Sequence, residues 1–161
     1  MLFRSAPATL RIDGGFNDTP VILTGTTDSF AQMRDPAQRF GVALDLRSPA
    51  AMIGFRGSLG EPVDFDDVDG RLQVATAAVQ TMLSVFGASL PANYPLRIGG
   101  RLSRRGDAWR IHGGEGEVAG SKFAGDIGIV EGGRGAADDV ELDLDFVRLD
   151  LSAIMPEGSQ P

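Results

Sequence analysis

Residues that could carry out chemistry are few in this sequence of 161 residues. His112 is the only histidine and cysteine is absent, so a thiol nucleophile and a cysteine metal site are excluded. A Ser-His-Asp triad would rest on His112 alone, and no nucleophile elbow accompanies it. His112 follows Ile111 at the end of an alternating segment, which favours a solvent-facing or turn position. We therefore expect a protein that is not an enzyme.

The acidic run DFDDVDG, from Asp64 to Gly70, looks like a calcium-binding loop at first sight. The EF-hand pattern requires glycine at its sixth position and a bidentate glutamate at its twelfth. Asp69 and Ala75 occupy those two positions here, and Val68 occupies the fifth. We therefore interpret the run as a solvated turn, and we expect neither a metal nor a cofactor.

Charge limits the kinds of partner further. The formal net charge is -7 and no basic face is evident, which argues against a nucleic-acid surface. Arg101, Arg104 and Arg105 form one short basic cluster, which could contact a phosphate or lipid headgroup but is more typical of an exposed turn. No pair of carboxylates is distinguished by its surroundings as a glycoside-hydrolysing pair. A binding or structural module is the leading interpretation.

Alternation of apolar and polar residues recurs through most of the chain and predicts half-buried strands. Turn sequences rich in glycine, such as HGGEGE after Ile111, separate these segments. Connections of this length fit antiparallel hairpins, because parallel crossovers need a dozen or more residues. The 22 glycines and 9 prolines agree with a fold made of many short strands and turns.

The clearest alternation lies in residues 140–146, where four apolar residues on one face alternate with acidic residues on the other. Beyond this segment the apolar positions shift by one residue, to Leu149 and Leu151. Such a shift would turn the apolar set outward unless the strand changes direction. We therefore predict a β-bulge or bend near Val147 and Arg148.

One segment breaks the period of two. Within residues 73–87 the apolar side chains fall three and four positions apart, and Gly87 is a natural helix end. We predict one amphipathic helix here, which covers an end of the sheet. A membrane-surface helix is disfavoured, because the polar face carries no lysine or arginine. The helix face would consist of Ala75, Ala78, Val79, Met82, Leu83 and Phe86.

The predicted fold class is mainly β. Residues 1–161 are expected to form a single domain, long enough to bury a sizeable core. Its sheet would be curled and antiparallel, a meander that is groove-like or partly closed, with the single helix at about 73–87. The apolar side of such a sheet is either filled by side chains and the helix, or open as a groove.

The second half of the sequence contains an ordered set of short motifs. They are GASLP (87–91), PLRI (95–98) with Gly100 and Leu102, the strand around Trp109, GEVAGS (116–121), FAG (123–125) and LDL (149–151). This set resembles the C-terminal region of the AsmA family of bacterial envelope proteins. One departure is AAD at 136–138, where the family often has a proline before the last long strand. Family members also typically carry an N-terminal membrane anchor, for which this sequence has no counterpart, so the chain looks like a segment of a longer protein.

The resemblance implies a non-enzymatic periplasmic module of outer-membrane biogenesis, in a full-length protein anchored to the inner membrane. Such a module would hold or conduct phospholipid along an apolar β-groove between the inner and outer membranes. An envelope protein is a further possible partner. The groove candidates are Leu96, Ile98, Trp109, Ile111, Phe123, Ile127, Val140, Leu142, Leu144 and Phe146.

Two other interpretations stay open. The first is a protein-interaction or assembly scaffold without a lipid groove, whose exposed edge strands pair with a partner or with the rest of the chain. The second is a hydrolase acting on envelope glycan, which would need a polar cleft with two facing carboxylates. An open groove, an open edge and an acidic cleft are the features that distinguish the three.

Overall fold

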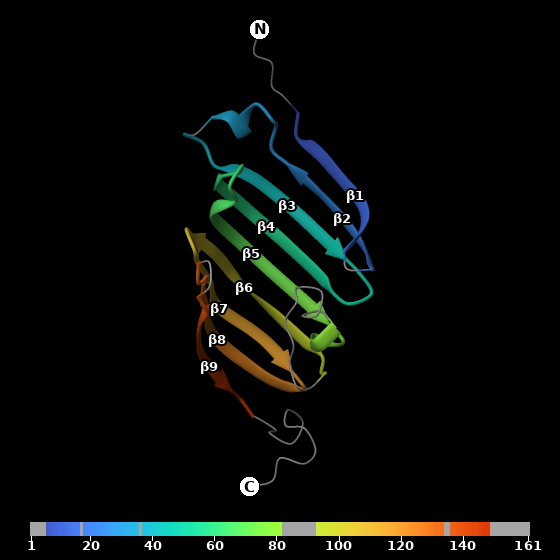
Figure 1. Ribbon diagram of the computed structural model, residues 1–161, viewed down its shortest axis with the longest axis vertical. Coiled ribbons are helices and arrows are strands. Elements are labelled where there is room, and N and C mark those ends of the chain that lie inside the picture. Colours follow the sequence, from blue (N-terminus) through green and yellow to red (C-terminus); the bar gives the residue numbers. More distant parts are fainter. Residues whose placement is uncertain (1–5, 17, 36, 82–92, 134–135, 149–161) are drawn as a thin grey trace.

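The computed structural model describes residues 6–16, 18–35, 37–81, 93–133 and 136–148. These residues form one antiparallel sheet of nine strands, and the order of strands in the sheet is their order in the sequence (Figure 1). The sheet is strongly twisted, and β1 and β9 lie at opposite edges, so it is not closed. The predicted curled antiparallel meander is therefore confirmed in its open form. The strands are β1 (Ala8–Phe16), β2 (Thr19–Thr27), β3 (Phe40–Arg47), β4 (Met52–Glu61), β5 (Asp66–Thr76), β6 (Leu96–Arg105), β7 (Ala108–Val118), β8 (Ser121–Val130) and β9 (Asp139–Phe146).

The predicted helix begins later than its sequence pattern indicated. Residues 73–76 belong to β5, residues 79–81 are helical, and the remainder of the predicted segment, 82–87, lies outside the described residues. Gln73 pairs with Gly54 on β4 and with Gly99 on β6, and β5 has a partner strand on both sides as far as Ala75. This two-sided pairing favours strand over helix at these residues. A 3-10 helix, η1 (Gln32–Arg34), precedes β3.

The strand register gives the sheet two chemically different faces. Residues paired across neighbouring strands point to the same side, so each cross-strand row has one character. One row runs through Leu23, Leu46 and Ile53 on β2, β3 and β4, and apolar rows of this kind continue to β9. We call this side the apolar face and the opposite side the polar face. The polar face carries Arg11, Asp13, Asp45, Arg47, Arg56, Asp69, Arg71, Arg97, Arg101, Arg110, Glu115, Glu117, Asp126, Glu141, Asp143 and Asp145.

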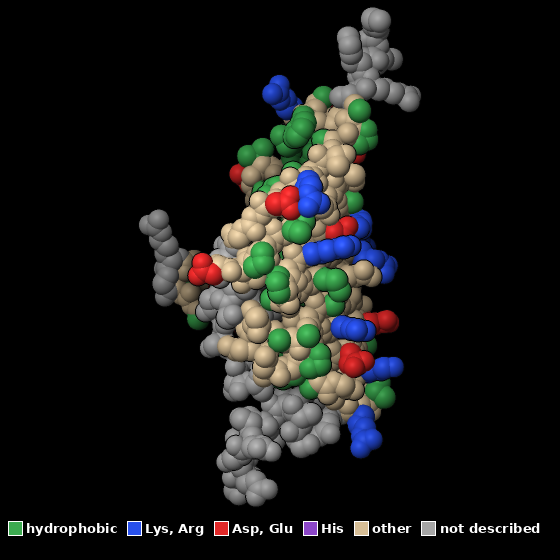
Figure 2. All heavy atoms as spheres, turned by 90° about the vertical axis from the view of Figure 1, so that its right-hand side faces the viewer, with side chains coloured by type: hydrophobic (Ala, Val, Ile, Leu, Met, Phe, Trp, Pro, Cys, Tyr) green, Lys and Arg blue, Asp and Glu red, His purple; other side chains and the backbone are tan. Residues whose placement is uncertain are grey.

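The two faces are visible when the sheet is seen from its side. Figure 2 shows arginine and acidic side chains projecting together from the right-hand side of the molecule. The one well-buried apolar cluster among the described residues lies at β3–β5 and consists of Phe40, Val42, Leu59 and Val68. Met33 of η1 is among the half-buried residues that pack against this cluster. Among the described residues, this buried cluster is therefore local to β3–β5.

Glycines on the apolar face allow large side chains to lie close to the backbone. Gly57 and Gly70 are paired across β4 and β5, and a Cβ atom at Gly57 would lie 2.7 Å from Cζ of Phe55. Phe123, the cross-strand partner of Gly116, lies over it in a similar way, with its Cζ at 2.5 Å from the position of a Cβ atom. Both rings therefore lie directly over glycine backbone.

The strands depart from regular pairing at three places. Register shifts occur at residues 99–101 of β6 and at 111–114 of β7. Such shifts are typical of β-bulges, which increase the twist of a sheet. β9 ends at Phe146, and Val147 and Arg148 form a bend. There the Val147 amide donates a hydrogen bond to the Lys122 carbonyl at 3.1 Å. The bend predicted near residues 147 and 148 is confirmed.

Candidate functional site

All ten predicted groove residues lie on the apolar face of β6–β9. The β8–β9 register aligns Phe123 with Phe146 and Ile127 with Leu142. On β7, Ile127 is aligned with Ile111. The Phe123 and Phe146 rings are 5.7 Å apart between centroids. Their shared face is a structural finding, whereas their role in lipid binding stays a prediction.

The exposure of this face rises sharply towards β9. Phe123 on β8 is 6% exposed, whereas Val140 and Leu142 on β9 are 56% and 61% exposed. Ile12 on β1, at the other edge, is 51% exposed. Apolar side chains of this size normally avoid water, so an exposed row of them indicates a contact surface. The candidate site is therefore the apolar face, most accessible at its edges.

The same face extends over β1–β5, which the sequence-based groove set did not include. Leu44 and Phe55 are paired across β3 and β4, and Phe55 continues the row to Leu72 on β5. The signal for these residues was the same period-two alternation. The face is thus about twice as wide as the predicted groove, because it spans nine strands instead of the last four.

The apolar face ends at an arginine side chain next to the β6–β7 hairpin. Arg104 is aligned with Trp109 on this face, and its guanidinium carbon lies 4.9 Å from the centre of the indole ring. Arg104 also donates to the carbonyl oxygens of Phe65 and Gly106, both at 3.0 Å. Trp109 Nε1 donates to Glu131 Oε1 at 2.6 Å. These contacts give the apolar face a polar margin at this end.

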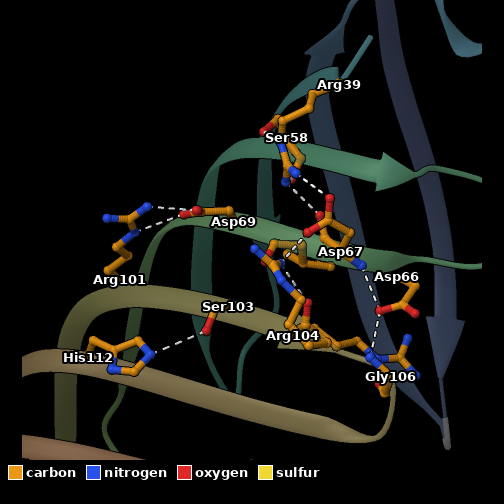
Figure 3. Close-up of polar contacts among 12 residues, drawn as sticks. Arg39, Ser58, Asp66, Asp67, Asp69, Arg101, Ser103, Arg104, Gly106 and His112 are labelled. Carbon is orange, nitrogen blue, oxygen red and sulfur yellow. Dashed lines mark hydrogen bonds and ion pairs between the residues drawn. The ribbon is translucent and has the colours of Figure 1, made fainter. Parts of the chain in front are cut away.

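Carboxylates of the acidic run, residues 64–70, accept hydrogen bonds from arginines and from backbone amides (Figure 3). The run begins within a turn at residues 62–65 and continues into the first residues of β5. Asp66 Oδ1 accepts hydrogen bonds from the Asp67 amide at 2.6 Å and the Gly106 amide at 2.8 Å. The Asp67 carboxylate forms ion pairs with Arg39 and Arg105. The run therefore fastens β5 to its neighbours.

Asp69 and Arg101 form a bidentate ion pair between β5 and β6, with N–O distances of 2.9 and 2.7 Å (Figure 3). The three arginines of the predicted basic cluster thus have partners within the chain. All three arginines lie in β6, with Arg104 and Arg105 at its end, so the prediction that they form an exposed turn is wrong. Within the described ranges, no group of three or more metal-ligating side chains is placed to hold a metal ion.

His112 is exposed on the polar face, so the predicted solvent-facing position is confirmed, but it lies inside β7 together with the HGGEGE segment that was predicted as a turn. Its Nε2 atom is 3.4 Å from Ser103 Oγ, and its Nδ1 atom is 3.7 Å from Asp126 Oδ2. The ring is one member of an exposed row of polar side chains. This geometry orients the histidine without forming a catalytic triad among the described residues.

Asp69→Asn is expected to weaken the dependence of folding stability on pH. Hydrogen bonding from Arg101 is the main cause that lowers the pKa of Asp69 below its ordinary value of 3.8. A carboxyl with a lowered folded-state pKa stabilises the fold fully above pH 3.8, and this contribution is lost as pH falls through the folded-state value. Urea unfolding midpoints above and below pH 3.8 should therefore differ less for Asp69→Asn than for the unmodified chain.

Asp64→Asn is the matched control, because Asp64 makes no hydrogen bond or ion pair with another described residue. It should retain the pH dependence of the unmodified chain. An identical pH profile for Asp69→Asn and the unmodified chain would contradict the role assigned to the Asp69–Arg101 pair.

Comparison with curated proteins found a similar sequence in Escherichia coli K12, the AsmA family protein YhjG. The two are 28% identical over 93 residues, which is 58% of this chain. The match supports a relationship with the AsmA family. The chain spans only 14% of the length of YhjG, so it corresponds to a small part of that AsmA protein. No family model matches the chain, and no solved structure matches it.

The described residues contain no helix that is both long and apolar enough to cross a bilayer. This finding concerns the described ranges alone.

Proposed function

We propose that this chain is a non-enzymatic lipid-handling module of the bacterial cell envelope, and that its apolar face contacts the acyl chains of phospholipid. The observation that carries the proposal is the continuous apolar face, with Val140 and Leu142 more than half exposed at one edge. The relationship with the AsmA family supports an envelope role. A periplasmic location, an anchor in the inner membrane and transport towards the outer membrane belong to the same proposal.

The energetics of such a face suit a ligand without specific polar contacts. Each acyl methylene removed from water contributes about 0.8 kcal/mol, so a few methylenes on an apolar row hold a chain measurably. Rows repeat from strand to strand at about 4.8 Å, and the face therefore runs continuously across the sheet. An acyl chain lying across the strands would meet apolar side chains along its whole length.

Leu142→Asp is expected to reduce the phospholipid that copurifies with the chain from bacterial membranes by at least about tenfold. A charge on the apolar face must be desolvated when an acyl chain covers it, which costs more than the 1.4 kcal/mol that corresponds to tenfold. Leu142 is 61% exposed, so the folded chain should tolerate the change. Native mass spectrometry and lipid extraction measure the bound phospholipid.

Thr26→Asp is the matched control, because it adds the same charge at an exposed position of the polar face. It should retain phospholipid at the level of the unmodified chain. Absence of phospholipid from the unmodified chain, or full retention by a folded Leu142→Asp variant, would contradict the proposal.

The second candidate function is an assembly scaffold, and the open edges of the sheet favour it. Within the described residues, β1 pairs only with β2 and β9 pairs only with β8. Each edge therefore presents backbone groups that can accept another strand. A chain that binds a protein partner through an edge and carries no lipid would support this function over the first.

A further inference from the structure

We propose that the polar face carries a second site, which binds a phosphate group in a depression across β3–β7. This site lies on the opposite side of the sheet from the acyl-chain face. The inference goes beyond the proposed function and does not depend on it. Its support comes from the shape of the polar face, from arginine side chains that have no partner among the described residues, and from glycines that leave the floor open.

A single cross-strand row forms the floor of the depression. The register aligns Asp45, Gly54, Gln73, Gly99 and Glu115 on consecutive strands from β3 to β7. Two adjoining cavities of about 470 and 630 Å³ open on this row and share its last three residues. We call the depression the arginine trench. It is defined by Gly54, Gln73 and Gly99 as floor and by Arg47, Arg71 and Arg97 around them.

The side chains of the three trench arginines make no hydrogen bond or ion pair with any described residue. Neighbouring arginines on the same face differ, because Arg56 pairs with Asp45 at 2.6 Å and Arg101 pairs with Asp69. Unpaired guanidiniums clustered beside one depression supply donors and positive charge for an anion.

The register places like charges side by side across the trench wall. Arg71 on β5 is aligned directly with Arg56 on β4 and with Arg101 on β6. Like charges directly opposite one another destabilise a sheet. Ion pairs with aspartates offset the repulsion at Arg56 and Arg101, whereas the side chain of Arg71 between them has no acidic partner among the described residues. An anion above Arg71 would remove this repulsion.

The floor glycines leave more room above the backbone than other glycines of the sheet. A Cβ atom at Gly99 would have its nearest neighbour at 3.6 Å, and one at Gly54 would meet only the Asp45 carboxylate at 3.3 Å. By contrast, a Cβ atom at Gly70 would lie 2.6 Å from the Gly57 Cα atom. Gly99 borders the register shift of β6, where glycine is common, whereas Gly54 lies in a regular ladder, where glycine weakens a strand. The effect of both glycines is to keep the trench open.

The donor set favours phosphate over carboxylate. Phosphate presents oxygens in several directions and can bridge two guanidiniums, whereas a planar carboxylate matches the fork of one. Arg71 and Arg97 border the same shared floor residues, Gln73 and Gly99. Glu115 lies at the β7 end of the floor and repels further negative charge. The site therefore suits a single phosphate group, free or in a lipid headgroup, and not a polyanion.

Binding to the 161-residue chain should be measured by calorimetry with inorganic phosphate and by cosedimentation with phosphatidylglycerol vesicles, using phosphatidylcholine vesicles as the uncharged reference. The double variant Arg71→Gln/Arg97→Gln is expected to weaken binding of whichever probe binds by about tenfold or more, since each lost charged hydrogen bond is worth about a factor of ten. Gly99→Glu should have a similar effect, because it fills the trench with a carboxylate.

Arg110→Gln is the matched control, since Arg110 lies on the polar face outside the trench. It should retain binding of both probes, whereas Leu142→Asp should retain binding of inorganic phosphate, which separates this site from the acyl-chain face. Binding of vesicles without binding of inorganic phosphate would assign the site to a lipid headgroup, whereas binding of both would show that phosphate alone suffices. The proposal is overturned if neither probe binds, or if Arg110→Gln weakens binding as much as the double variant.

Discussion

Gly57→Ala is expected to lower the free energy of unfolding by about 3 kcal/mol, the upper part of the range for overpacking. A Cβ atom at Gly57 would collide with the Asp69 carbonyl oxygen and would lie 2.5 Å from the Gly70 Cα atom. These are backbone atoms of the paired strand, so they cannot move without opening the β4–β5 ladder. Urea unfolding followed by circular dichroism measures the loss.

Gly99→Ala is the matched control, because it makes the same chemical change on β6, where a Cβ atom would meet its nearest neighbour at 3.6 Å. It should leave the free energy of unfolding within about 0.5 kcal/mol of the unmodified chain, as surface substitutions generally do. Equal losses for the two variants would show that glycine matters here through general strand propensity and not through the close approach of β4 and β5.

Phe40→Ala is expected to destabilise the chain by about 3–5 kcal/mol, the usual cost of removing a buried aromatic ring. Phe40 is only 5% exposed and belongs to the buried cluster at β3–β5. Few other apolar side chains of the described residues are buried to this extent, so the rest of the sheet has little with which to compensate. Urea unfolding again gives the free energy.

Ile12→Ala provides the comparison for Phe40→Ala, because Ile12 is on the same face but 51% exposed. Its cost should stay below about 1 kcal/mol, since little of the side chain leaves water on folding. Amide hydrogen exchange should in addition rise most in β3–β5 for Phe40→Ala. Similar costs for both substitutions would contradict a core confined to one part of the sheet.

The strands and their two faces could be predicted from the sequence because side-chain direction in a strand depends only on a period of two. Val140, Leu142 and Leu144 share a face for this reason, whatever strand lies beside them. The bend after Phe146 was predictable from the same rule, because the apolar positions change phase there. Local sequence was sufficient for these features.

The beginning of the predicted helix was wrong because two periods overlap at residues 73–76. Ala75 and Ala78 fit a helix, whereas Leu72, Val74 and Thr76 fit a strand equally well. Pairing with both β4 and β6 decides in favour of the strand, and this pairing involves residues far away in the sequence. Tertiary context therefore overrides the local pattern at this point.

The arginine trench had no signal in any single segment. Arg47, Arg71 and Arg97 are separated by more than twenty residues each, and only the register of four strands brings them around one depression. Glycine at outward-facing positions, as at Gly54 and Gly99, was the one available hint. Its meaning depends on which residues lie opposite, which the sequence alone does not state.

The serial order of the nine strands has a mechanical consequence. Every ladder of backbone hydrogen bonds joins two segments adjacent in the chain, and no long crossover locks the sheet from one edge to the other. A force that pulls the first and last strands apart therefore loads each ladder in succession and peels the sheet from its ends inward. The β3–β5 region, where the buried cluster adds to the ladders, would be the last part to give way.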